Sequence, residues 1–214
     1  MVISELQFKC LQKINCSDFD SVLEIYQTSF PAHERLPIEV FKTRIQSGLD
    51  ELIVGYLQGE VVLMATVCLL SNTSGLVLVY LATSPKFKGQ GAGTLFFHNL
   101  SQRLQQQNQV LFLEVEDPEI GNLETRKTRQ RRYQFYRRLG AKTLGEVTYF
   151  VPSQTEEPAE KMLLMVWQYP ETKMESQFVK QIIQKMYQEI YSRPQDDPLL
   201  KKIIQEIPDQ IELL

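Results

Sequence analysis

The stretch TSPKFKGQGAGTL, residues 83–95, decides the fold of this chain. At its centre lies the loop Lys88-Gly89-Gln90-Gly91-Ala92-Gly93. A phosphate binds well where several backbone N–H groups converge at the N-terminus of a helix, and only small side chains let the backbone approach closely. The residues that meet this requirement are Gly89, Gly91, Ala92, Gly93 and Thr94. The loop therefore predicts a phosphate-binding turn.

The segments on either side of this loop predict a strand before it and a helix after it. Residues 76–83 are largely apolar, as in a buried strand, and between about Gly91 and Gln106 apolar side chains recur at spacings of three and four. A dinucleotide-binding pattern that starts at Gly89 would need glycine at Thr94, and a nucleoside-triphosphate loop needs a Gly-Lys-Ser/Thr end that is absent. Both of those ligand classes are therefore disfavoured.

The rest of the chain up to residue 168 mixes strands and helices. We expect strands at residues 5–11, 51–57, 61–70, 110–116, about 143–151 and about 162–168. We expect helices at residues 17–30, in a short segment ending at Gly48 and in a segment ending at Gly140. The turn Gln58-Gly59-Glu60 is typical of an antiparallel hairpin. This order predicts an α+β fold.

Beyond Pro170 the character of the sequence changes. Phe178, Ile182, Met186 and Ile190 recur every four residues and define one apolar face of a helix. From Pro194 onward a tail follows, with a second short amphipathic segment. We expect residues 1–170 to form the main domain, and residues 171–214 to form a helical extension that packs on this domain or mediates an oligomer contact.

The composition limits the classes of function. The chain has 214 residues, 43% hydrophobic and 23% charged, which is ordinary for a globular protein. Its three cysteines lack the spacing of a zinc site or a disulfide framework, so reduced thiols and no bound metal are expected. A net charge of -3 gives no overall attraction for nucleic acid. The opening segment does not resemble a secretory leader, and no run approaches the ~20 apolar residues of a membrane span. These features predict a cytoplasmic protein without a nucleic-acid or membrane partner.

Two motifs resemble the GNAT superfamily of N-acetyltransferases. Residues 83–95 look like the family's Val-x-Pro-x-x-Arg-Gly-x-Gly-x-Gly-x-x-Leu, with Lys88 in place of the usual arginine, and residues 132–141 look like its Phe-Tyr-x-x-Leu-Gly-Phe motif. The resemblance covers roughly residues 5–168. It implies the acyl-CoA N-acyltransferase fold, in which a mixed, mostly antiparallel central sheet is flanked by helices. It also implies acetyl transfer from acetyl-CoA to a primary amine by direct attack in a ternary complex.

The resemblance also implies a set of cofactor contacts. In this family two central parallel strands splay apart around the thioester, and by analogy these are residues 76–83 and 110–116. A backbone N–H near Leu81 or Ala82 would hold the thioester oxygen. Lys88 keeps the charge of the family's arginine but lacks its planar fork. The residues expected to bind acetyl-CoA are Leu81, Ala82, Thr83, Lys88, Gly89, Gln90, Gly91, Ala92, Gly93, Thr94 and Arg129.

The reaction needs a general acid for the departing thiolate and a route for the proton of the amine. Tyr136 matches the tyrosine that the family often uses as the acid, and tyrosine is protonated at neutral pH. Candidates for the base are Glu114 and Glu116, which project from one face of their strand, and Glu34 in the loop after the first helix. His33 could instead serve, although exposed loop histidines usually have no such role, and a chain of waters that relays the proton to bulk solvent is equally plausible. The base is left open at this stage.

The basic run Arg126-Lys127-Thr128-Arg129-Gln130-Arg131-Arg132 departs from the family pattern. It is either a solvated helix face supported by Glu119 and Glu124, or a source of arginines that pair with the strand glutamates or bind an acidic acceptor or the cofactor's ribose phosphate. Two other functions stay open, an acyl-CoA-binding sensor without turnover and a nucleic-acid-binding module. The identity of the amine, a small molecule or a peptide, and the choice between monomer and homodimer are also open.

Overall fold

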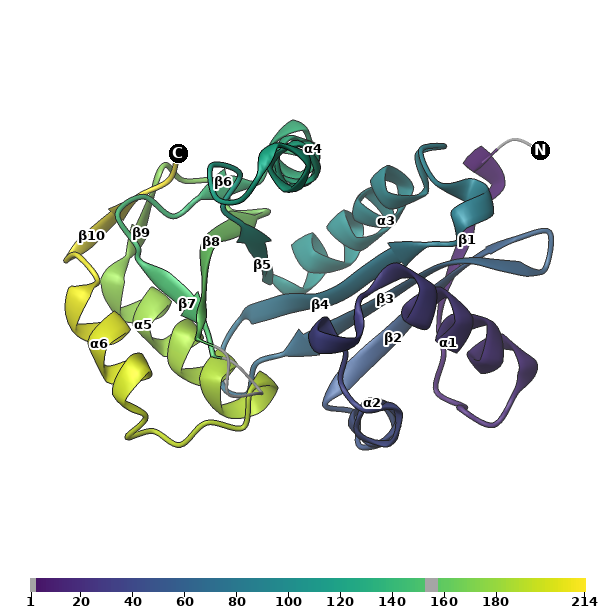
Figure 1. Ribbon diagram of the computed structural model, residues 1–214, viewed down its shortest axis with the longest axis horizontal. Helices are drawn as coiled ribbons and strands as arrows, with labels where there is room; N and C mark the ends of the chain where they lie inside the picture. The colour runs from purple at the N-terminus through teal and green to yellow at the C-terminus, as the bar shows by residue number, and fades with distance from the viewer. Residues whose placement is uncertain (1–2, 153–157) are drawn as a thin grey trace. The chain divides into compact units, whose positions relative to one another are not determined.

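The computed structural model describes residues 3–152 and 158–214 and divides the chain into two units (Figure 1). The first unit comprises Met1–Leu69 and Leu78–Gln107, and the second comprises Leu70–Val77 and Asn108–Leu214. Strand β4 (Gly75–Thr83) therefore begins in the second unit and continues in the first.

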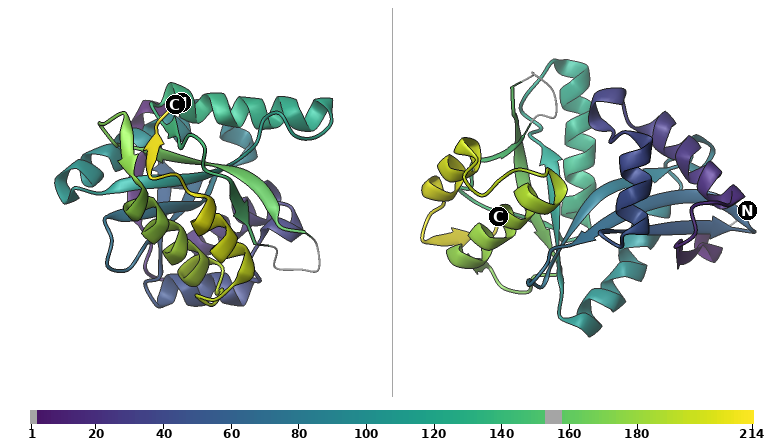
Figure 2. Two further views of the ribbon diagram at one scale, coloured as in Figure 1. Left: turned by 90° about the vertical axis from the view of Figure 1, so that its left-hand side faces the viewer. Right: turned by 90° about the horizontal axis from the view of Figure 1, so that it is seen from below.

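The first unit is a sheet with strand order β1-β2-β3-β4. Its elements, besides most of β4, are η1 (Ile3–Glu5), β1 (Gln7–Cys10), α1 (Ser17–Ser29), η2 (Ala32–Glu34), α2 (Ile38–Gln46), β2 (Asp50–Leu57), β3 (Glu60–Leu69), η3 (Pro85–Phe87) and α3 (Ala92–Gln107). Helices α1 and α2 cover one face of this sheet and α3 covers the other (Figures 1 and 2). The strand-turn-helix order around the glycine-rich loop is as the sequence predicts.

The hairpin of β2 and β3 is antiparallel and forms where it was expected. Gln58 and Gly59 turn the chain with φ values of 52° and 84°, a left-handed conformation that suits tight hairpin turns. Beneath α1 and α2, the buried rings of Tyr26 and Phe41 stack at 4.5 Å between their centroids, and Tyr80 of β4 meets Tyr26 edge to face at 4.9 Å. This aromatic cluster fixes β4 against both helices.

The second unit is organised around β8. Its elements are β5 (Val110–Glu116), α4 (Leu123–Arg138), β6 (Lys142–Thr143), β7 (Tyr149–Val151), β8 (Glu160–Trp167), β9 (Lys173–Glu175), α5 (Ser176–Lys185), η4 (Met186–Ile190), α6 (Pro198–Glu206) and β10 (Gln210–Glu212). Strand β8 pairs antiparallel with β5, β6 and β7. Strands β9 and β10 pair with each other, and α5 lies beside α6 (Figure 2).

The expected single strand over residues 143–151 is wrong. The chain instead forms β6, leaves the strand at Gly145 and Glu146, and re-enters as β7. Glu146 has φ 58°, a left-handed conformation that a continuous strand cannot contain. At Gly145 an added Cβ would lie 2.9 Å from the carbonyl oxygen of Glu212, so the close approach of the C-terminal strand also requires glycine there.

The apolar helix expected after Pro170 is present as α5, and it continues through η4 as a π-helical turn. It packs closely on the start of β4, because a Cβ added at Gly75 would lie 2.3 Å from Cδ1 of Ile182. The fold as a whole confirms the α+β prediction of a mostly antiparallel sheet flanked by helices. Within the described residues, no helix combines the length and apolarity required to cross a membrane.

Candidate functional site

The glycine-rich loop of the first unit has the backbone conformation expected of a phosphate-binding turn. After β4 and η3, Gly89 and Gly91 have φ values of 75° and 95°, and α3 begins at Ala92. A Cβ built on either glycine meets nothing within 4 Å. Glycine is therefore required by the left-handed conformation rather than by crowding, and the space beside the loop is open.

The amide groups of this loop are largely unused inside the chain. Gln90 N–H donates to the carbonyl of Phe87 at 3.4 Å, and Leu95 N–H closes the first turn of α3 on Gly91 at 3.1 Å. Within residues 3–152 and 158–214, no backbone acceptor faces the N–H groups of Gly89, Gly91, Ala92, Gly93 and Thr94. Because the first N–H groups of a helix also carry the positive end of its dipole, this turn suits an anion.

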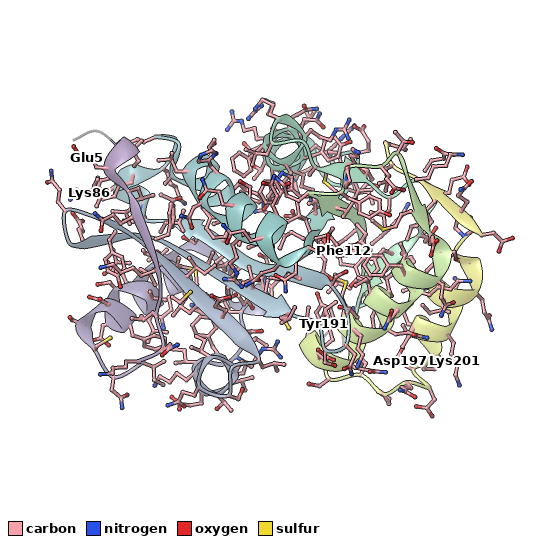
Figure 3. The ribbon with its side chains drawn as sticks, turned by 180° about the vertical axis from the view of Figure 1, so that it is seen from behind. Glu5, Lys86, Phe112, Tyr191, Asp197 and Lys201 are labelled. Atoms are coloured by element: carbon pink, nitrogen blue, oxygen red, sulfur yellow. The ribbon has the colours of Figure 1, made fainter. Side chains whose placement is uncertain are left out.

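Two lysines flank the turn and differ in their surroundings. Lys86, labelled in Figure 3, lies 3.0 Å from Glu60 and 5.0 Å from the ring centroid of Phe87. Lys88 is exposed and forms no ion pair with any residue that the structure describes. Of the two lysines, the one at the basic position of the motif, Lys88, is thus the one whose charge no described acidic residue compensates.

Strand β4 ends at Leu81, Ala82 and Thr83, immediately before the loop. Ala82 is buried, whereas Leu81 and Thr83 are partly exposed. The amide of Ser84 donates to the carbonyl of Val62 at 2.8 Å and so ties the start of the loop to β3. The expected contact of these residues with the cofactor stays a prediction.

Tyr80 of β4 holds the loop that carries Glu34, a role that the sequence did not indicate. Its hydroxyl donates to the carbonyl of Glu34 at 3.0 Å and accepts from the amide of Leu36 at 3.2 Å. The Glu34 carboxylate is close to half exposed and lies 3.7 Å from His33. Glu34 is therefore fixed through its backbone, while its side chain reaches toward solvent.

In the second unit, Glu114 of β5 is bonded through both carboxylate oxygens. Tyr149 donates to Oε1 at 2.5 Å and Tyr191 donates to Oε2 at 2.7 Å. Burial raises the pKa of Glu114, and the two hydroxyl donors act in the opposite direction. Neither tyrosine was identified from the sequence.

The charges of Arg132 and Glu116 both act on Tyr136. The Arg132 guanidinium lies 2.5 Å from a Glu116 carboxylate oxygen, and it precedes Tyr136 by one turn of α4. Burial raises the pKa of the Tyr136 hydroxyl to about 12, with the Arg132 charge lowering it and the Glu116 charge raising it. Tyr136 is therefore protonated at neutral pH, as a general acid must be.

The basic run lies on α4 and shows both arrangements that the sequence left open, a solvated helix face and a pairing with a strand glutamate. Arg126 pairs with Glu119 at 2.6 Å, as in a solvated helix face, whereas Arg132 pairs with the strand glutamate Glu116. Arg129, expected at the cofactor, lies 2.7 Å from Glu160. Its proposed contact with acetyl-CoA stays a prediction.

Comparison with known proteins identifies the family. The model of the acetyltransferase (GNAT) family matches residues 19–141. No curated protein matches the chain.

Solved structures share the fold. A GNAT-family protein from Bacteroides thetaiotaomicron has 21% identity and a TM-score of 0.73, with 88% of this chain and 99% of that chain covered. An aminoglycoside 6'-N-acetyltransferase complexed with coenzyme A has 14% identity, a TM-score of 0.58, and coverage of 77% and 99%. The ribosomal-protein-S18-alanine N-acetyltransferase from Escherichia coli has 18% identity, a TM-score of 0.54, and coverage of 75% and 92%. Because the family model spans more than half of its length, the chain belongs to the acetyltransferase (GNAT) family and is an acetyl-CoA-dependent acyltransferase.

Proposed function

We propose that the protein transfers the acetyl group of acetyl-CoA to a primary amine by direct attack in a ternary complex. The observation that carries this proposal is the turn at residues 88–94, where left-handed glycines and the start of α3 leave amide groups without an acceptor among the described residues. A diphosphate matches such a turn because several N–H donors and a helix dipole act on one anion. Lys88 adds the nearby positive charge.

The identity of the donor is supported by a structural neighbour, the aminoglycoside 6'-N-acetyltransferase, which was solved with coenzyme A. In this proposal the amides of residues 89–94 hold the diphosphate, and the end of β4 pairs with the pantetheine. An N–H of Leu81 or Ala82 stabilises the negative charge that develops on the thioester oxygen.

The acetyl transfer forms a C–N bond, breaks the C–S bond, and moves one proton from the amine and one to the thiolate. Glu114 is our choice for the group that takes the amine proton, because both its oxygens are fixed and burial raises its pKa. Glu116 is already paired with Arg132, and Glu34 is exposed, so they are the second choices. Tyr136 donates the proton to sulfur.

Direct attack on the thioester needs a nucleophile with a lone pair, and a neutral amine supplies one on its nitrogen. Two structural neighbours are named for amine acceptors, a ribosomal-protein alanine in one case and an aminoglycoside in the other. These acceptors belong to those proteins, and for this chain they define the panel to be tested. We propose a primary amine on either a small molecule or a peptide.

The first test is thermal unfolding with and without acetyl-CoA, which separates binding from turnover. A ligand that binds the folded state raises the melting temperature, and Gly91→Val should abolish the rise because the new side chain disturbs the left-handed turn. Gly48→Val is the matched control, since Gly48 has φ 76° and an equally open surrounding but lies outside the loop. An undiminished rise in Gly91→Val would contradict the assigned turn.

The second test measures thiol release with a panel of peptide N-termini, lysine-containing peptides, aminoglycosides and small amines. A ternary complex predicts intersecting double-reciprocal lines, and parallel lines would indicate an acyl-enzyme instead. Tyr136→Phe should release thiol far more slowly, and full activity in that variant would exclude the tyrosine. Acetyl-CoA binding without thiol release for any amine would contradict the proposed acceptor class.

A further inference from the structure

The carboxylate of Glu114 is held by hydroxyl groups from two separate segments of the second unit. Tyr149 lies at the start of β7, whereas Tyr191 follows the π-helical turn η4 in the C-terminal segment, 77 residues away from Glu114 (Figure 3). Each tyrosine donates to a different carboxylate oxygen. Glu114 therefore cannot rotate without breaking at least one of these bonds.

The local helix geometry determines where Tyr191 lies. The amide of Tyr191 donates to the carbonyl of Met186 at 3.3 Å, five residues earlier, which is the bonding pattern of a π-helix. Such a turn contains one more residue than an α-helical turn, so it changes the direction of the side chains that follow. A regular continuation of α5 would direct residue 191 elsewhere.

The C-terminal segment is itself anchored at this point. Glu189 accepts from the amide of Ser71 at 3.0 Å and lies 3.2 Å from Lys185. Tyr187 donates to the carbonyl of Phe150 at 2.5 Å, and its ring meets that of Tyr191 edge to face at 6.2 Å. The segment that supplies the Tyr191 hydroxyl is thus fixed on two sides.

We propose that Tyr191, together with Tyr149, is a positioning residue that orients Glu114 to accept the proton of the amine. This inference rests on the proposed function. It assigns a part in acetyl transfer to the C-terminal segment, which lies beyond the region that the family model matches. The segment then has a role in the reaction as well as in the stability of the second unit.

Glu114 can take up a proton while it stays bonded to Tyr149 and Tyr191. Hydroxyl donors favour the ionised carboxylate, whereas burial favours the protonated form, so the two effects oppose each other in Glu114. When one oxygen takes the proton, that oxygen becomes a donor and its tyrosine hydroxyl must turn to accept. Two further ionisable groups belong to these surroundings: Tyr187, which interacts electrostatically with Glu114, and Glu116, which lies two residues along β5 and is paired with Arg132.

The test compares Tyr191→Phe with Tyr187→Phe as a matched control. Both changes delete one hydroxyl from the same aromatic cluster, but only Tyr191 donates to Glu114. Loss of a donor to the carboxylate raises its pKa, so the acid limb of kcat/KM should move up by about one pH unit in Tyr191→Phe and stay in place in Tyr187→Phe. Tyr149→Phe should move the limb in the same direction, and melting temperatures establish that each variant is folded.

A second readout does not need turnover. The Glu114 carboxyl carbon, labelled with 13C and assigned through Glu114→Gln, reports the titration of this group directly by NMR. The same upward shift is expected in Tyr191→Phe and not in Tyr187→Phe, and its absence would overturn the proposal. A shifted titration with an unmoved acid limb would also overturn it, because Glu114 would then not be the base. If the unaltered protein turns over no amine, the proposed function fails separately, and the NMR titration still decides whether Tyr191 holds Glu114.

Discussion

In the proposed function, the turn at residues 88–94 binds the cofactor and the cluster around Glu114 handles a proton, and the two are built in opposite ways. The turn presents backbone N–H groups that have no acceptor in the described chain, beside an uncompensated Lys88. Glu114 already has both of its oxygens bonded, and its neighbour Glu116 is paired with Arg132. The proposal therefore assigns cofactor binding to N–H groups without an acceptor among the described residues, and proton transfer to carboxylates whose partners are already present.

This difference indicates which substitutions should impair the turn and which should impair the cluster around Glu114. The turn depends on backbone conformation and on small side chains, so apart from Lys88, replacements that keep the left-handed glycines and the small residues should be tolerated. The cluster around Glu114 depends on individual side-chain atoms, so the loss of one carboxylate oxygen or one tyrosine hydroxyl should impair proton transfer. The predictions below separate affinity for acetyl-CoA from the rate of proton transfer on this basis.

The largest effect is expected for Glu114→Gln. The amide keeps the size of the side chain but cannot take a proton, so kcat should fall by about 10²–10⁴-fold, the usual contribution of a general base. Affinity for acetyl-CoA, measured by calorimetry, should not change, because the turn that we propose for the diphosphate belongs to the first unit. A near-normal kcat in Glu114→Gln would show that Glu114 is not the base, and Glu34, Glu116 or water would then be the candidates.

The next effect separates the two lysines that flank the turn. Lys88→Gln should weaken acetyl-CoA binding by about tenfold, the equivalent of one charge-assisted contact with phosphate. Lys86→Gln removes the same charge two residues earlier, but Lys86 already pairs with Glu60, so a much smaller loss is expected. Equal losses in calorimetric titrations would mean that general charge, rather than a specific contact, attracts the cofactor.

Local patterns predicted the turn well because its requirements are local. Small residues, a preceding apolar strand and a following helix face all lie within residues 76–106, and the observed φ values of Gly89 and Gly91 agree with them. The hairpin at Gln58 and Gly59 was predictable for the same reason.

The cluster around Glu114 was not predictable, because its contacts join distant parts of the chain. Tyr191 reaches Glu114 across 77 residues, and no periodicity in the sequence indicates that η4 is a π-helical turn. The three-residue strands β9 and β10 are too short to show alternation. The break between β6 and β7 depends on the left-handed Glu146, a conformation that glutamate rarely adopts.

The alkaline side of the pH profile tests the state of Tyr136. In its proposed role the tyrosine acts as an acid only while protonated, and burial raises its pKa to about 12. A raised pKa moves the loss of the acid to higher pH, so kcat should change by less than about twofold between pH 8 and pH 10 for a stably folded enzyme. A decline centred near pH 9 that disappears in Tyr136→Phe would contradict the raised pKa.

The smallest effect concerns two neighbouring arginines of α4. Arg132 pairs with Glu116, whereas Arg131 is exposed and forms no ion pair with a described residue. Arg132→Gln should lower the free energy of unfolding by about 0.5–1 kcal/mol, a shift in melting temperature of about 1–4 °C, and Arg131→Gln should change it by less than about 0.5 kcal/mol.

The two arginine variants lose the same charge from the same helix, so the difference between them isolates the ion pair. That difference should shrink when the salt concentration rises from about 0.1 M to about 1 M, because Arg132 is partly exposed and its charge is screened. A difference that persists at high salt would show that Arg132 acts through packing instead. Equal stabilities at low salt would show that the pair of Glu116 and Arg132 does not stabilise the fold. Glu114 would then be the carboxylate of β5 that its partners hold in place.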